Sequence, residues 1–193
     1  EDSFLDASSF KKIAHVAETA NTLLHFLRKF NDYYPNLNKK GLEIECTKEI
    51  NKAIDFVFDK YGEIKDSASP DLVNIRRSMQ LVRGKINQSF GFALSQYNSS
   101  GYLDDIKETV VENRRVLAVL AMNRKKVKGS VLGTSKTGSI VYIEPEATLR
   151  YSRELSDLEQ DEREEIIRIL KQLSNSIRPY KNLLTKYQDF LSD

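Results

Sequence analysis

The sequence predicts a mainly α-helical protein, with long antiparallel lever helices on a helical base and a small antiparallel β clamp inserted at their tip. Three observations support this fold class. Apolar residues recur at helical spacing over most of the chain. The 193 residues include only 8 Gly and 4 Pro, while 30% are charged, which is typical of long solvated helices. Runs of β-branched residues are confined to 109–145, where the period changes.

The helical base comes first. Apolar spacing predicts a helix over 3–30, and the Pro, Asn and Gly residues of 33–41 predict a loop. Thr47 is expected to cap a second helix, which continues to Phe58. A tight turn at 59–62 and an extended segment at 63–68 follow.

The outgoing long helix has a clear start. Ser69, Pro70 and Asp71 supply a hydroxyl cap, a proline at the first helical position and an acid in the first turn. The apolar stripe then advances in steps of three and four through Leu72, Ile75, Met79, Val82, Ile86, Phe90, Leu94 and Tyr97. This spacing predicts one amphipathic helix of about 30 residues, or about 45 Å.

The β segment and the returning helix complete the chain. Three or four short antiparallel strands are expected at 109–111, 116–120, 127–132 and 139–143. Helical spacing returns over 147–177, Pro179 breaks it, and a last helix follows. The chain therefore divides into a core segment (1–68), an outgoing lever (69–108), a basic clamp (109–145) and a returning lever with a core helix (146–193).

The positive charge is concentrated in one segment. The whole chain has a net charge of +2, but 109–145 holds seven of the 30 cations and only two of the 28 acids. Its cations precede strands or occupy turns, where they can meet phosphate oxygens together with small and hydroxyl residues. The candidate nucleic-acid-binding residues are Arg114, Arg115, Arg124, Lys125, Lys126, Lys128, Thr134, Ser135, Lys136 and Gly138. The alternative is a solubilising role, since cations also protect exposed strands from pairing.

The residue inventory argues against a catalytic site. His15 and His25 are too far apart on a helix to share a metal, and Cys46 is the only cysteine. The 133–138 loop resembles a phosphate loop, but it lacks the second glycine of that motif and a strand follows instead of a helix. The acids of 159–165 are interpreted as a solvated helix face, and Glu144 as a residue that orders the strand-to-helix junction.

The run 128–145 resembles the clamp signature of the MutS family of DNA mismatch-repair proteins, and most closely that of its second bacterial subfamily. The segment 55–76 resembles the stretch that leads into the lever helix of that subfamily, and 164–170 resembles the returning lever. The three motifs occur in order and span nearly the whole chain.

This resemblance implies a non-catalytic lever and clamp that grips the backbone of double-stranded or branched DNA without sequence readout. It places the protein in mismatch repair or recombination control. The resemblance further implies a bacterial homodimer. No stretch of the sequence approaches the roughly 18 apolar residues that a membrane span needs, so no membrane association is expected, and the single cysteine is typical of the reducing cytoplasm. The chain starts at Glu1 without a methionine and is expected to be a fragment. ATP, Mg, the ATPase motifs and a nuclease domain would belong to the rest of the parent protein, and no cofactor is expected here. Two alternatives stay open: a protein-interaction lever that dimerises, and a clamp that acts on ribosomal RNA of stalled ribosomes.

Overall fold

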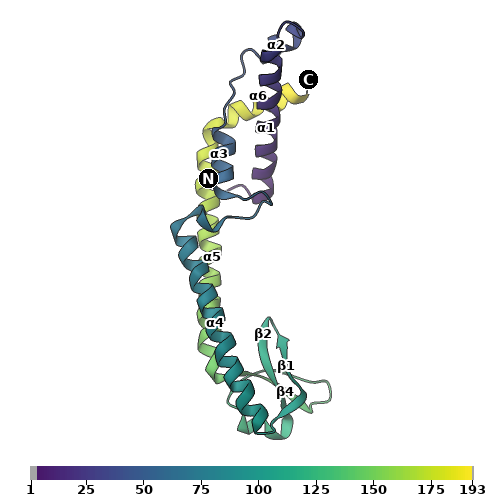
Figure 1. Cartoon of the computed structure of the whole chain (residues 1–193), viewed down its shortest axis with the longest axis vertical. Helices are drawn as coiled ribbons and strands as arrows, with labels where there is room; N and C mark the ends of the chain where they lie inside the picture. Colours follow the sequence, from purple (N-terminus) through teal and green to yellow (C-terminus); the bar gives the residue numbers. More distant parts are fainter. Residues whose placement is uncertain (1–3, 193) are drawn as a thin grey trace. The chain divides into compact units, whose positions relative to one another are not determined.

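The computed structural model describes residues 4–192 and confirms the predicted fold class. It is mainly helical, with one four-stranded antiparallel sheet inserted in the sequence between the two longest helices (Figure 1). The chain forms two compact units. The first joins the described residues up to Val73 to those from Arg163, and the second comprises Asn74–Glu162. No helix among residues 4–192 is long and apolar enough to cross a membrane.

The first unit is built from helices. They are α1 (Ala7–Lys29), α2 (Pro35–Gly41), α3 (Glu49–Val57), the 3₁₀ turn η1 (Asp66–Ala68), the start of α4 (Pro70–Ser99), the end of α5 (Glu146–Ile177), η3 (Arg178–Tyr180) and α6 (Lys181–Ser192). Asp6 caps α1 by accepting the Ser9 N–H at 2.8 Å. The core takes apolar side chains from α1, α3, α5 and α6, among them Phe10, Leu24, Ile54, Leu173 and Ile177.

Tyr187 ties α6 into this core. Its ring is fully buried, and its hydroxyl donates to the carbonyl of Glu45 at 2.8 Å. The hydroxyl oxygen of Tyr187 also accepts the backbone N–H of Thr47 at 3.3 Å. Burial raises the pKa of the Tyr187 hydroxyl, because the phenolate would lose its hydration. A neutral phenol with both a donor and an acceptor partner satisfies the buried oxygen and holds the segment before α3 against α6.

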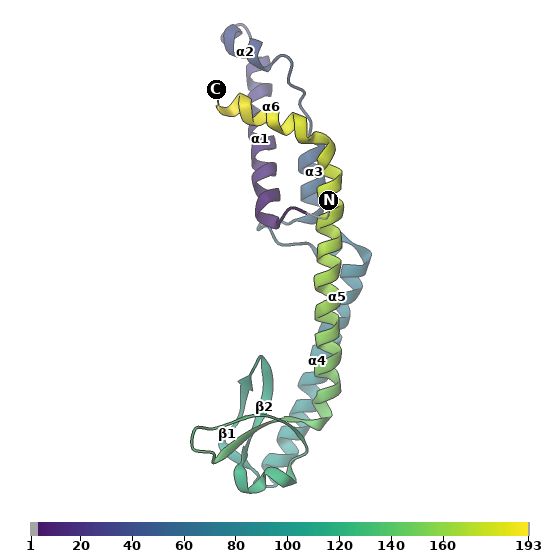
Figure 2. The ribbon, with the colours of Figure 1, turned by 180° about the vertical axis from the view of Figure 1, so that it is seen from behind.

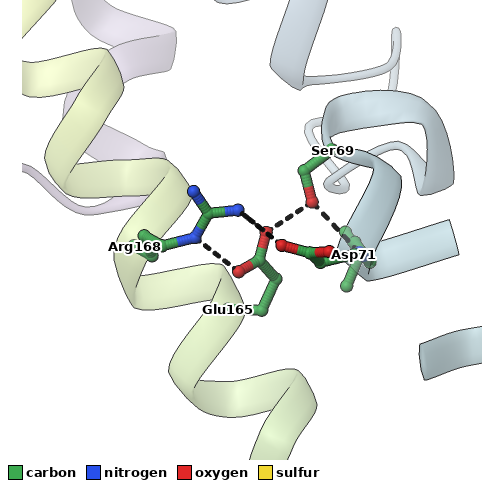
Figure 3. Close-up of polar contacts among 5 residues, drawn as sticks. Ser69, Asp71, Glu165 and Arg168 are labelled. Atoms are coloured by element: carbon green, nitrogen blue, oxygen red, sulfur yellow. Dashed lines mark hydrogen bonds and ion pairs between the residues drawn. The ribbon is translucent and has the colours of Figure 1, made fainter. Parts of the chain in front are cut away.

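A buried carboxylate joins the start of α4 to α5 (Figure 3). Ser69 accepts the N–H of Leu72 at 3.0 Å, which is the predicted cap of α4, and its hydroxyl donates to Glu165. Arg168 donates twice to Glu165, each time at 2.6 Å, and reaches Asp71 at 3.2 Å. Glu165 is only 8% exposed, so the interpretation of all the 159–165 acids as a solvated face is wrong for this residue.

The second unit contains the rest of α4, the sheet and the first part of α5. The strands are β1 (Leu103–Val111), β2 (Arg114–Leu120), β3 (Gly129–Thr134) and β4 (Ile140–Pro145), with the 3₁₀ turn η2 (Ala121–Lys126) between β2 and β3. Their order is β1-β2-β4-β3, and every neighbouring pair is antiparallel. A separate core forms from Phe90, Ala93, Leu117, Val119, Val127, Val141 and Ile143.

Within this unit α4 and α5 run antiparallel and side by side (Figures 1 and 2). Arg76 pairs with Glu162 at 2.7 Å, and Arg83 pairs with Glu159 at 3.7 Å. As the residue number on α4 rises from 76 to 83, that of the partner on α5 falls from 162 to 159, as expected for antiparallel helices. Glu159 and Glu162 are half-buried in these pairs, so they belong only in part to the solvated helix face predicted for 159–165.

Three local predictions need correction. Residues 35–41 form α2 rather than a loop, because Pro35 stands at its first position, where a proline is favourable. Residues 66–68 form the 3₁₀ turn η1, although the bridge between Phe58 and Ile64 shows that the segment before it is extended. Thr47 accepts the Glu49 N–H at 3.2 Å, but Lys48 occupies the cap position of α3 and makes no side-chain capping bond.

Strand β1 begins at Leu103, six residues before the predicted start at Thr109. Its first half is polar, with Asp104, Asp105 and Lys107, so the sequence lacks the alternation that marks a strand. The strand lies at the edge of the sheet and its register with β2 shifts between Leu103 and Glu108. An edge strand has only one neighbour, so it tolerates both the polar residues and the register shift.

The Glu165 cluster predicts a specific dependence of stability on pH. The hydrogen bonds from Arg168 lower the pKa of Glu165, so the stabilisation is fully present above the ordinary carboxyl value of about 4.3 and is lost as pH falls through the folded value. We expect Glu165→Gln to lower the free energy of unfolding by about 1.5–3 kcal/mol at pH 7. The difference from wild type should shrink at pH 3 in urea titrations followed by circular dichroism. Glu154→Gln, an exposed change on the same helix, should match wild type at both pH values. An equal loss from Glu165→Gln at both pH values would contradict this role.

Candidate nucleic-acid interface

Three of the predicted cations lie on η2, the turn that leaves β2. The turn is anchored on both sides: Asn123 is 6% exposed and Val127 is 1% exposed. Arg124 donates to the carbonyl of Val127 at 3.4 Å, and the Lys126 ammonium lies 5.0 Å from the centre of the Tyr102 ring. Lys125 is exposed. The backbone of the turn is therefore held in place, while Lys125 and Lys126 are exposed to solvent.

The turn between β3 and β4 carries the remaining hydroxyl and glycine candidates. Ser135 donates its N–H to the Ile140 carbonyl at 2.9 Å and accepts the Ile140 N–H on its side chain at 3.1 Å. Gly138 has a φ of 70° and donates to the Ser135 carbonyl at 2.9 Å, so the turn needs a residue that adopts the left-handed region readily. Ser135 and Gly138 thus shape the turn, and Lys136 is exposed between them.

The two turns meet at one end of the sheet. The Ala121 N–H donates to the Ser139 carbonyl at 2.9 Å, and Leu120 lies opposite Ile140. The start of η2 therefore adjoins the β3–β4 turn, although Ala121 and Ser139 are 18 positions apart in the sequence. This contact gives one end of the sheet cations from two separate segments.

Arg114 and Arg115 lie at the other end of β2. The strand has seven residues, so about 20 Å separates its ends. Arg114 pairs at 3.0 Å with Glu144, whose side chain is 2% exposed. Arg115 pairs with Glu108 at 2.6 Å, and its guanidinium lies 4.2 Å from the centre of the Phe90 ring. Lys128 is at the same end, because the adjoining Gly129 pairs with Pro145. The sequence predicted which residue types would carry the charge but not that they divide between the two ends of the sheet.

Glu144 lies at the junction of β4 and α5, as expected, and forms part of a pocket of about 490 Å³. The pocket also has Arg83, Arg114 and Arg115 in its wall. The pair with Arg114 connects the start of β2 to the end of β4. The Oε1 atom of Glu144 has no hydrogen-bond partner among the described residues. These contacts make Glu144 a structural partner of a predicted phosphate-binding residue, which the sequence did not reveal.

Three lysines form a distinct group, which we call the lysine set: Lys125, Lys128 and Lys136. All three are exposed, and none forms an ion pair or, unlike Lys126, a cation–π contact with another residue of 4–192. The backbone N–H of Lys128 donates to the Tyr97 hydroxyl at 3.3 Å, which fixes its place beside α4. In the sequence Tyr97 is recognisable only as part of the apolar stripe of α4, because its spacing fits a buried helix face.

No protein-family model matches the sequence. Several curated proteins are similar to the sequence over most of its length. The chain is 31% identical over 164 residues, or 85% of its length, to a protein named Endonuclease MutS2 from Halothermothrix orenii, of which it covers 21%. It is 31% identical over 173 residues to the Symbiobacterium thermophilum protein of the same name, covering 90% of this chain and 22% of that one. The Lachnoclostridium phytofermentans protein is 33% identical over 150 residues, 78% of this chain and 19% of the relative.

These similarities support the MutS family, and within it the proteins named MutS2, as the source of the resemblance. The chain spans about a fifth of the length of the curated relatives it matches.

The start of β3 provides a sharp test of the sheet geometry. Gly129 has a φ of 155°, and a Cβ there would lie 2.1 Å from the carbonyl oxygen of Glu144. We expect Gly129→Ala to lower the free energy of unfolding by about 2–5 kcal/mol, because the backbone must shift to remove the clash. Gly133→Ala on the same strand is the matched control, since its Cβ would meet only Tyr142 at 3.8 Å. Thermal melts that show equal stability for the two variants would contradict the close approach of β3 to β4.

Proposed function

We propose that this chain is the non-catalytic lever and clamp segment of a MutS2-like protein, and that its sheet grips a nucleic-acid backbone without reading the sequence. One observation carries the proposal: the lysine set is exposed and forms no ion pair with any residue of 4–192, in a segment that holds seven cations and two acids. Phosphate contacts of this kind supply sequence-independent affinity. The relatives are named endonucleases, a word for enzymes that cut nucleic acid, and this name agrees with the choice of ligand.

The proposed contacts fall into two groups. The lysine set, with Arg124 and Lys126, would meet phosphates directly. Arg114 and Arg115 keep side chains that are 43% and 38% exposed, so each can add an outward donor while its ion pair holds it in place. Thr134, Ser135 and Gly138 would shape the turn that presents Lys136.

In this proposal α4 and α5 are levers that move the sheet. The rest of the parent protein would bind ATP and Mg to drive that motion and would carry any nuclease activity. Two copies would close around duplex or branched DNA in mismatch repair or recombination control. The same chemistry would serve ribosomal RNA, because a grip on phosphates does not distinguish the two backbones by charge.

A second candidate function is a protein-interaction lever. Leu81 and Phe92 on α4 are 63% and 71% exposed. They are eleven residues apart, which is three helical turns, so they lie on the same helix face. A second copy of the chain could cover this face. Light scattering at rising protein concentration tests it: a dimer that Leu81→Glu with Phe92→Glu dissociates would support the interaction role, and a monomer throughout would contradict it.

Replacing the lysine set with alanine tests the grip. We expect the triple variant to bind duplex DNA more weakly whatever its sequence, and the slope of log affinity against log salt to fall by about 0.9 for each lost phosphate contact. Fluorescence anisotropy with a labelled duplex, a four-way junction and a structured RNA would measure both quantities and rank the three ligands.

The control removes the same charge elsewhere. Lys11, Lys39 and Lys171 are exposed lysines of the first unit. Their alanine triple variant should keep wild-type affinity and salt slope. Equal binding by the two triple variants would refute the assignment of the lysine set, and an absence of binding by the wild-type chain at low salt would refute the proposed function itself.

A further inference from the structure

One apolar side chain stands among the cations of η2. Met122 is 85% exposed, the highest exposure of any large apolar residue in the range 4–192. It follows Ala121 directly and precedes Arg124 by two positions. A methionine this exposed gains little from folding, because most of its side chain stays in water.

The backbone around Met122 is held in place. The N–H of Ala121 donates to Ser139 at 2.9 Å on one side, and Asn123 is buried on the other. The exposure of Met122 therefore comes from a fixed turn and not from a free chain end. The same hydrogen bond brings the β3–β4 turn, with Lys136, alongside. Met122 thus stands one position after the contact with that turn and two positions before Arg124, the first cation of η2.

This arrangement matches a known way of contacting double-stranded nucleic acid. Proteins that bind the minor groove insert apolar wedges, methionine among them, between base steps while cations beside the wedge hold the phosphates. Methionine suits the task because its unbranched, polarisable side chain adapts to an irregular apolar gap. A cationic turn with no apolar tip would hold the backbone but would not reach into the stack.

We infer that Met122 inserts between bases of the nucleic acid that the sheet grips, and that it makes binding favour duplexes whose stacking is already interrupted. The inference rests on the proposed function. Opening an intact base step costs free energy, and a nick or an unpaired nucleotide lowers that cost without unstacking the neighbouring bases completely. The cost of opening the step therefore offsets the free energy of burying the side chain least at an interrupted site. Specificity for structure, rather than for sequence, would follow from this one residue.

The test compares three labelled duplexes of equal length: one uninterrupted, one nicked and one with a single unpaired nucleotide. We expect the wild-type chain to prefer the interrupted duplexes by about tenfold, the effect of burying most of one methionine side chain. Met122→Ala should abolish the preference and retain salt-dependent binding to the uninterrupted duplex. Met122→Leu, which keeps an apolar side chain of similar volume, should restore it.

A second readout and a control separate insertion from a general loss of binding. A 2-aminopurine base beside the nick should brighten on binding wild type, because its emission rises when it unstacks, and should not brighten with Met122→Ala. Ile106→Ala, at a 72% exposed apolar residue of β1, should behave as wild type in both measurements.

Each outcome decides a different claim. The same duplex preference in wild type and Met122→Ala would overturn the insertion. So would binding by wild type with no preference at all. A loss of affinity in the alanine variant of the lysine set, while Met122→Ala keeps the wild-type duplex preference, would support the phosphate grip and refute the insertion of Met122. Absence of wild-type binding to all three duplexes would overturn the grip and the insertion together.

Discussion

The buried carboxylate of Glu165 is the constraint on which the helical part of the molecule depends. It accepts hydrogen bonds from Arg168 on its own helix and from Ser69, whose oxygen also caps α4. One side chain therefore decides where α4 begins and which part of α5 lies beside that start. A charge that is 8% exposed would be costly alone, but here its partners compensate the lost hydration.

The sequence predicted those parts of the fold that local chemistry determines. Ser69, Pro70 and Asp71 marked the start of α4, and its apolar stripe gave the length, because 30 residues at one period allow no other regular structure. Helix α2 was missed because its seven residues are too few to show a period, and Pro35 favours loops as well as helix starts. The early start of β1 was missed because an edge strand with one exposed side carries polar residues that break the alternation.

The candidate site was predicted less completely, because residue types were visible and neighbours were not. The order β1-β2-β4-β3 separates Arg114 from Lys136 by the length of β2, and no local signal contains that order. The pairing of Arg114 with Glu144 joins residues 30 positions apart, so it depends on the strand register. Glu165 looked like one acid among several on a solvated helix, and only the packing of α5 against Ser69 distinguishes it.

The two outer strands share a feature that bears on how the protein behaves at high concentration. Both β1 and β3 lie at the edges of the sheet, and each has a shift in register with its single neighbour, between Leu103 and Glu108 in one and between Val131 and Gly133 in the other. A flat edge with an unbroken row of free backbone groups is a template for lateral growth of a sheet. An irregular edge interrupts that row. The same strands that frame the proposed grip are therefore poor seeds for aggregation, so the cationic surface can stay open without recruiting copies of itself into fibres.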